Sequence, residues 1–227
     1  MFEDAGRLAQ IIDHTLVRPD ATIEDIATGC EEAKKYGFAA FIVNGCHAAR
    51  ARAALAGTPV KVGAVVGFPH GASTTTVKIV EAMEAMKNGA EELDIVINIG
   101  LVKSGRYDLV EIDMKNIIVM TPKTIHKVIV ETGYLTTEEI ANVCRLAVRA
   151  GAEFVITSTG YGPRGATVED VRLIREVVGS LCRVKASGGI RDLATVSALA
   201  EAGAERIGTS AGASIMEEYM KQNGRER

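Results

Sequence analysis

The sequence has no tryptophan, and aromatic residues make up only 4% of it. Proteins that bind single-stranded nucleic acid stack the bases on aromatic side chains, so this composition argues against such a partner. An excess of positive charge is also missing, because 26 Lys and Arg face 29 Asp and Glu and give a net charge of −3. The charge therefore does not favour nucleic acid or an acidic membrane. An anionic ligand would have to be held by a local site.

Paired cysteines and long apolar runs are missing too. No apolar run approaches the roughly 20 residues of a membrane-spanning helix, and the acidic N-terminal segment does not have the pattern of a signal peptide. The cysteines are far apart and form no Cys-x-x-Cys motif, which argues against a disulfide framework and against a zinc site. They are Cys30, Cys46, Cys144 and Cys182. We therefore expect a cytoplasmic protein with no membrane partner and no bound metal.

What the sequence does contain is a repeated junction. In four places a helical pattern ends at a glycine, and a short apolar run follows. Glycine directly after a helix supplies the left-handed conformation that ends it, and the short apolar run fits a strand buried in a parallel sheet. The four glycines are Gly37, Gly89, Gly151 and Gly203. Such repetition predicts stacked βα units.

Filling the intervals between these junctions predicts eight strands, each followed by a helix. We place the strands near residues 9–13, 38–43, 60–67, 92–98, 125–131, 153–158, 182–187 and 205–209. We place the helices near residues 22–36, 47–56, 73–88, 106–120, 137–150, 168–179, 192–202 and 211–221. This pattern predicts an α/β protein with one closed (β/α)₈ TIM barrel over residues 1–227. An open doubly wound sheet usually has fewer strands and begins with a Gly-x-Gly-x-x-Gly turn, which the sequence lacks.

The chemistry of such a barrel lies at the C-terminal ends of its strands. The first predicted strand ends in Asp13 and His14. These residues have two interpretations. They form a simple turn whose acid caps the next segment, or Asp13 lies at the rim of a pocket and accepts a hydrogen bond from a hydroxyl group.

Charged residues also lie inside apolar strands. Asp94 belongs to the fourth strand, where a carboxylate is costly to bury unless it is paired. It is therefore either part of a structural ion pair or a proton-transfer group whose pKa is adjusted by a nearby lysine. Lys185 lies in the middle of the seventh strand, and we expect it to point inward with Asp94 or Glu131 as its partner. Lys127 begins its strand, which places it near the bottom of the barrel.

Small and hydroxyl residues follow the last three strands. Barrels often bind phosphate with the loops after strands 7 and 8 and with a helix N-terminus, because backbone N–H groups can then approach the anion closely. Three such stretches on neighbouring strand ends predict a site for a phosphorylated small molecule. The candidate residues are Thr157, Gly160, Gly188, Gly189, Gly208 and Ser210.

Taken together, these motifs resemble those of the deoxyribose-phosphate aldolases, a family of lysine-dependent (class I) aldolases. The matching stretches occur in the family's order along nearly the whole chain. They are residues 12–15, 65–69, 92–100, 127–132, 157–160, 185–191 and 208–210. The resemblance implies reversible cleavage of 2-deoxy-D-ribose 5-phosphate to glyceraldehyde 3-phosphate and acetaldehyde, without a cofactor. It also implies a homo-oligomer, because barrels of this family are often dimers.

The resemblance further implies roles for single residues. Asp94 takes part in a proton relay, and Lys185 lies beside the nucleophilic lysine and lowers its pKa. The glycines at 160, 188 and 189 hold the phosphate together with Ser210. The family's sixth strand ends in Lys-Thr-Ser-Thr-Gly, but here the first position of that motif is Ile156. Isoleucine has no nitrogen and cannot form the imine on which the reaction depends.

Three explanations of Ile156 remain open. It is an engineered substitution that silences an aldolase, which the otherwise intact motifs favour. Alternatively, Lys185 has become the nucleophile of a rewired aldolase. The third explanation is a non-catalytic barrel that binds a phosphosugar. In each case Ile156, Asp94 and Lys185 are expected to surround one site.

Overall fold

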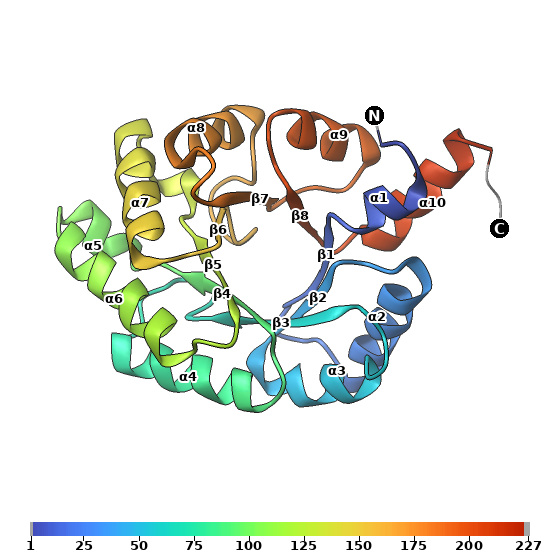
Figure 1. The fold of residues 1–227 in the computed structure, drawn as a ribbon, viewed down its shortest axis with the longest axis horizontal. Helices are drawn as coiled ribbons and strands as arrows, with labels where there is room; N and C mark the ends of the chain where they lie inside the picture. Colours follow the sequence, from blue (N-terminus) through green and yellow to red (C-terminus); the bar gives the residue numbers. More distant parts are fainter. Residues whose placement is uncertain (1, 225–227) are drawn as a thin grey trace.

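The computed structural model describes residues 2–224, and within this range eight parallel strands close into a barrel with β1 beside β8 (Figure 1). The predicted TIM barrel is therefore confirmed. The strands are β1 (Ile12–Leu16), β2 (Ala40–Val43), β3 (Lys61–Val66), β4 (Glu92–Val96), β5 (Ile125–Ile129), β6 (Phe154–Ile156), β7 (Arg183–Ser187) and β8 (Arg206–Thr209). Residues 1 and 225–227 of the expected domain lie outside the described residues.

Helices surround the barrel on all sides, as the view along its axis shows (Figure 1). They are α1 (Ala5–Ala9), α2 (Ile23–Tyr36), α3 (Ala48–Ala54), α4 (Thr75–Lys87), α5 (Ile99–Lys103), α6 (Tyr107–Met120), α7 (Thr137–Ala150), α8 (Val168–Val178), α9 (Leu193–Glu201) and α10 (Gly212–Gln222), with short 3₁₀ turns η1 (Gly45–His47) and η2 (Thr132–Tyr134). Each predicted strand and helix overlaps one of these elements.

The junction glycines have the backbone that the sequence predicts. Gly37, Gly89, Gly151 and Gly203 all have positive φ angles, between +69° and +111°. Side chains other than glycine rarely adopt this conformation. These positions therefore end their helices and turn the chain into the next strand.

The predicted start of the first strand was wrong, because residues 5–9 form α1. The side chain of Asp4 accepts a hydrogen bond from the backbone N–H of Arg7 at 2.8 Å and caps this short helix. As a result His14 lies inside β1 rather than in a turn. Its ring packs 5.2 Å from the Phe38 ring, outside the barrel, and its Nε2 lies 2.8 Å from Glu32.

All five residues of strand β4 are buried, although their side chains point alternately to the two sides of the sheet. Helices cover the outer side. Leu93 and Ile95 belong to an outer apolar cluster that includes Ile117 of α6. Glu92 and Asp94 point the other way and meet charged side chains from other strands. The barrel interior is therefore polar at this level, although both sides of the strand are buried.

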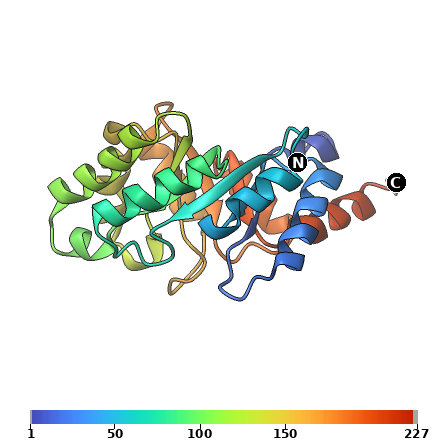
Figure 2. The same ribbon diagram turned by 90° about the horizontal axis from the view of Figure 1, so that it is seen from below.

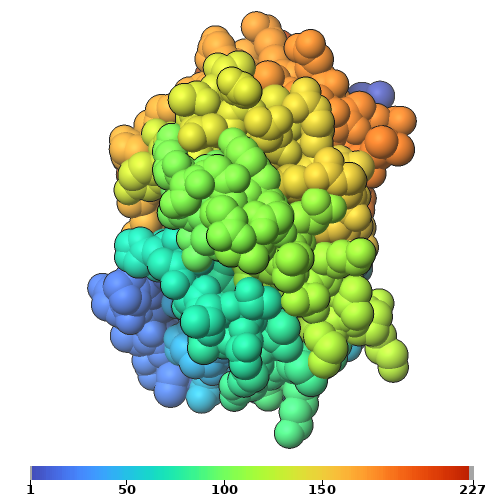
Figure 3. Space-filling view, turned by 90° about the vertical axis from the view of Figure 1, so that its left-hand side faces the viewer, coloured from blue at the N-terminus to red at the C-terminus, as the bar shows by residue number. Residues whose placement is uncertain are grey.

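The loops that follow β1 and β6 project from the same end of the barrel (Figure 2). This is the C-terminal end of the strands, where barrel enzymes place their chemistry. Viewed from the side of α4 to α7, the molecule presents α6 between α4 and α7 (Figure 3). Within residues 2–224, none of the helices combines the length and the hydrophobicity that crossing a bilayer requires.

Candidate active site

Charged side chains from five strands meet inside the barrel and form what we call the interior ion cluster. Barrel interiors are usually filled by branched apolar residues, so a charged centre points to a function. Lys185 Nζ lies 2.6 Å from Asp94 Oδ2 and 2.7 Å from Asp13 Oδ2. Lys127 Nζ lies 2.6 Å from the same Asp13 oxygen. The cluster comprises Asp13, Glu92, Asp94, Lys127, Lys185 and Arg206.

The six members of this cluster are three cations and three anions, and the partly exposed Lys61 lies 4.0 Å from Glu92 at its edge. Burial by itself raises the pKa of Asp13. The positive charges of Lys127, Lys185 and Arg206 together have a larger effect and hold this pKa well below its usual range. Burial likewise lowers the pKa of Lys127, but Asp13, Asp94 and Glu92 raise it above its usual value. Both groups are therefore charged at neutral pH.

The structure corrects two expected positions. Asp13 does not lie at a pocket rim, because its side chain is fully buried and ion-paired with Lys127 and Lys185. Lys127 does not lie at the bottom of the barrel, because it is opposite Asp94 in the ladder between β4 and β5. The expected pairing of Lys185 with Asp94 is present.

Ile156 borders the interior ion cluster. It is opposite Lys185 in the ladder between β6 and β7, and only 1% of its surface is exposed. It packs with Val96, Ile129 and Phe68, a group that we call the apolar collar. A cavity of about 20 Å³, the central cavity, is lined by Ile156 together with Asp94 and Lys185. This is close to the space that one water molecule needs, so hydrocarbon fills most of the space beside Asp94 and Lys185.

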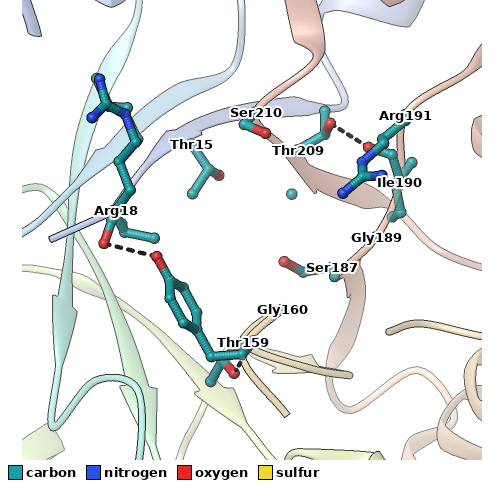
Figure 4. A pocket seen from close by; sticks show the side chains of 15 residues that line it. Thr15, Arg18, Thr159, Gly160, Ser187, Gly189, Ile190, Arg191, Thr209 and Ser210 are labelled. Atoms are coloured by element: carbon teal, nitrogen blue, oxygen red, sulfur yellow. Dashed lines mark hydrogen bonds between the residues drawn. The ribbon is translucent and has the colours of Figure 1, made fainter. Parts of the chain in front are cut away.

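A larger pocket opens beside the collar, at the ends of β1, β6, β7 and β8 (Figure 4). Its volume is about 270 Å³, and we call it the anion pocket. A Cβ at Gly188 would lie 3.2 Å from both the Gly165 Cα and the Ser158 Cβ. Glycine at this position therefore lets the three residues pack closely at the pocket wall. Most of the predicted phosphate-binding residues line this pocket: Gly160, Gly188, Gly189, Gly208 and Ser210.

Thr157, like Asp13, is a predicted binding residue that the structure does not bring to the anion pocket. It is fully buried. Its hydroxyl donates to the Ser187 carbonyl at 2.9 Å and accepts from the Ser187 N–H at 3.0 Å. Its observed contribution is to hold β7 against the end of β6.

The sequence reasoning missed two arginines that line the anion pocket, Arg18 and Arg191. Arg18 pairs with Asp20 at 2.7 Å. Arg191 has no ion-pair partner within residues 2–224 and lies beside Gly189 at the pocket edge (Figure 4). Arg191 directly follows the Gly188-Gly189-Ile190 stretch in the sequence, and this position was the signal that could have identified it as a pocket residue. Across the same residues, no group of His, Cys, Asp and Glu is arranged to hold a metal ion.

Known proteins share this arrangement along almost the whole chain. Deoxyribose-phosphate aldolase of Caldanaerobacter subterraneus subsp. tengcongensis is 51% identical, with coverage of 97% of this chain and 96% of that protein. The solved structure titled "QR15, an Aldolase" is 44% identical, covers 98% of both chains and superposes with a TM-score of 0.92. The tetrameric deoxyribose phosphate aldolase from Aeropyrum pernix is 31% identical, with a TM-score of 0.92 over 97% of this chain and 94% of that one. The sequence profile of the DeoC/LacD family aldolases matches residues 7–218. The chain therefore belongs to the DeoC/LacD family of aldolases.

Proposed function

We propose that this chain carries the site of a deoxyribose-phosphate aldolase whose covalent step is blocked by Ile156. The reaction is the cleavage of 2-deoxy-D-ribose 5-phosphate to glyceraldehyde 3-phosphate and acetaldehyde. One observation carries the proposal: the Ile156 side chain lines the central cavity together with Asp94 and Lys185. An amine at this position would have a carboxylate and a cation beside it, and here a hydrocarbon takes its place.

The anion pocket supports a phosphorylated substrate. Three of its lining residues are glycines with positive φ angles, Gly160, Gly188 and Gly189, and none of them has a side chain that would screen its backbone from a ligand. Helix α10 begins at Gly212, two residues after Ser210, and a helix N-terminus attracts anions. Arg191 adds a charged donor. In this proposal the phosphate binds among these groups, and the reacting carbon points toward Ile156.

Lys185 is poorly suited to replace the missing nucleophile. Nucleophilic attack needs a neutral amine with a free lone pair. Two carboxylates, Asp94 and Asp13, lie within 2.7 Å of Lys185 Nζ, so this nitrogen is engaged in two ion pairs. Only 1% of the residue is exposed. This favours the silenced aldolase, with non-catalytic binding of a phosphosugar as the second candidate.

Trapping with borohydride tests these alternatives. The chain is incubated with acetaldehyde, reduced with sodium borohydride and digested for peptide mass mapping. We expect no adduct on the peptides that contain Lys185 or Lys127, because both amines are paired with carboxylates. A stable adduct on Lys185 would establish the rewired aldolase and would overturn the silenced one.

We also propose a homo-oligomer, with α4 and α6 in the interface. Adjoining helices that expose several large apolar side chains are typical of an interaction surface. The exposed residues are Val77, Val80 and Met83 on α4 and Ile112, Val119 and Met120 on α6. This side of the molecule is shown in Figure 3.

Sedimentation velocity tests this assembly. We expect the unchanged chain to sediment as an oligomer and Val80→Glu to sediment as a monomer, because the interface would then bury an unpaired charge. Leu181→Glu is the matched control, since Leu181 is 78% exposed and lies between α8 and β7 rather than on α4 or α6. If the unchanged chain sediments as a monomer, the interface proposal fails.

A further inference from the structure

The loop after β6 separates the anion pocket from a second cavity. This side cavity has a volume of about 200 Å³ and is lined by Pro69, His70, Ile99, Glu131 and Tyr134, together with the loop. Thr159 and Tyr161 line both spaces. The loop that contains them is therefore a partition between the two cavities.

The partition is anchored at its base by Glu131. The carboxylate of Glu131 accepts hydrogen bonds from the Thr159 N–H, at 3.1 Å, and from the Thr159 hydroxyl. Its other oxygen lies so close to Gly162 that a Cβ there would be 2.7 Å away. Glu131 also has a positive φ of 55°, a conformation that costs free energy for a residue with a side chain. Glu131 contacts the loop at two points, Thr159 and Gly162.

Tyr161 completes the partition and reaches the opposite side of the pocket mouth. Its backbone N–H donates to the Thr159 hydroxyl at 3.0 Å. Its own hydroxyl donates to the Val17 carbonyl, at 3.3 Å, in the loop after β1. Its ring meets the ring of Phe68 edge-on, with 5.4 Å between the centroids. The Tyr161 side chain is therefore held by two other parts of the barrel rim, the loop after β1 at Val17 and the loop after β3 at Phe68.

We infer that Tyr161 is a specificity-determining residue that limits the length of the phosphorylated ligand by closing the anion pocket off from the side cavity. The inference rests on the proposed function, because it takes the anion pocket as the phosphate site. The pocket's 270 Å³ is slightly below the range of about 300–1,000 Å³ usual for ligand pockets. In this inference the Tyr161 ring is the part of the partition that keeps the 200 Å³ side cavity separate, so its removal is expected to join the two spaces. A longer chain attached to the phosphate could then extend past the loop.

Binding of polyol phosphates tests this inference without requiring catalysis. Glycerol 3-phosphate and sorbitol 6-phosphate have three and six carbons and no carbonyl group, so neither reacts. Their dissociation constants are measured by calorimetry on the unchanged chain and on Tyr161→Ala. We expect the unchanged chain to prefer the shorter ester about tenfold or more, and Tyr161→Ala to reduce the preference to less than about threefold.

Tyr134→Ala is the matched control. Tyr134 is 50% exposed and Tyr161 is 48% exposed, and both line the side cavity, but only Tyr161 also lines the anion pocket. Tyr134→Ala is expected to keep the preference of the unchanged chain. Equal binding of both esters by the unchanged chain would overturn the inference, as would a preference that Tyr161→Ala leaves intact or that Tyr134→Ala also abolishes. If neither ester binds to any of the three proteins, the anion pocket itself is refuted and the proposed function fails as well.

Discussion

Ile156→Lys is expected to raise the rate of 2-deoxy-D-ribose 5-phosphate cleavage by about 10⁴- to 10⁶-fold, the scale on which loss of a catalytic nucleophile acts. The introduced side chain would start beside Lys185 in the ladder between β6 and β7. The interior ion cluster already contains three cations and three anions among the described residues. A fourth cation would outnumber the three carboxylates and would face the like charge of Lys185, which lowers the pKa of an amine. The new amine is therefore expected to be largely neutral and nucleophilic.

Acetaldehyde release, followed with alcohol dehydrogenase and NADH, measures this effect. Ile156→Met is the control, because methionine fills a similar volume and has no amine, so this variant is expected to stay at the background rate. Borohydride reduction in the presence of acetaldehyde should label the peptide that contains position 156 in Ile156→Lys only. The aldolase assignment of this site fails if a folded Ile156→Lys protein still binds phosphate esters but cleaves no substrate.

Asp13→Asn is expected to lower the free energy of unfolding by about 3–5 kcal/mol, as removal of one partner from a buried ion pair does. Asp13 contacts Lys127, Lys185 and Arg206 and is completely buried. Without its charge, the three cations keep only two carboxylates. Urea unfolding of the two proteins gives the difference. Asp108→Asn is the control: Asp108 pairs with Arg106 at 2.8 Å on the surface, where water screens the charges, so this substitution is expected to leave the free energy of unfolding almost unchanged.

The effect of Asp13→Asn should depend on pH in a defined direction. The pKa of Asp13 is lowered in the folded protein, whereas in the unfolded chain it is near 3.9. A group with a lowered folded-state pKa stabilises the protein above its unfolded pKa and loses this contribution as the pH falls toward the folded value. The difference in unfolding free energy between the two proteins should therefore shrink below about pH 4. A difference that stays constant down to pH 2 would show that Asp13 does not act through its charge.

Local signals predicted the barrel, whereas contacts between strands were not accessible from the sequence. The glycine at each junction acts through its own backbone, so Gly37 and Gly151 could be identified from their neighbours. The sequence predicts a fourth strand up to residue 98, but β4 ends at Val96, and the side chain of Asn98 caps α5 by accepting a hydrogen bond from the Leu101 N–H at 3.2 Å. A five-residue helix is too short to show a periodic pattern.

In the candidate site, too, local signals could be recognised in the sequence, whereas contacts between strands could not. That Asp94 needs a cation follows from the cost of burying a carboxylate, and Lys185 supplies it. The register between β4 and β5 decides that Lys127 lies opposite Asp94, and no feature of either segment encodes this register on its own. Tyr161 could not be recognised as part of the mouth, because its hydroxyl reaches Val17, 144 residues earlier in the chain.

The interior ion cluster also bears on how the barrel assembles. Asp13 on β1 and Arg206 on β8 are 193 residues apart, and they meet only where the first and last strands pair. In the unfolded chain the carboxylate and its cations are hydrated. In a partly formed barrel, charged side chains would lose water before all of their ion-pair partners are in place. Half-formed barrels are therefore penalised relative to both the unfolded chain and the closed ring. The charged centre should make folding more cooperative, and a fragment without β8 is not expected to keep its interior dry.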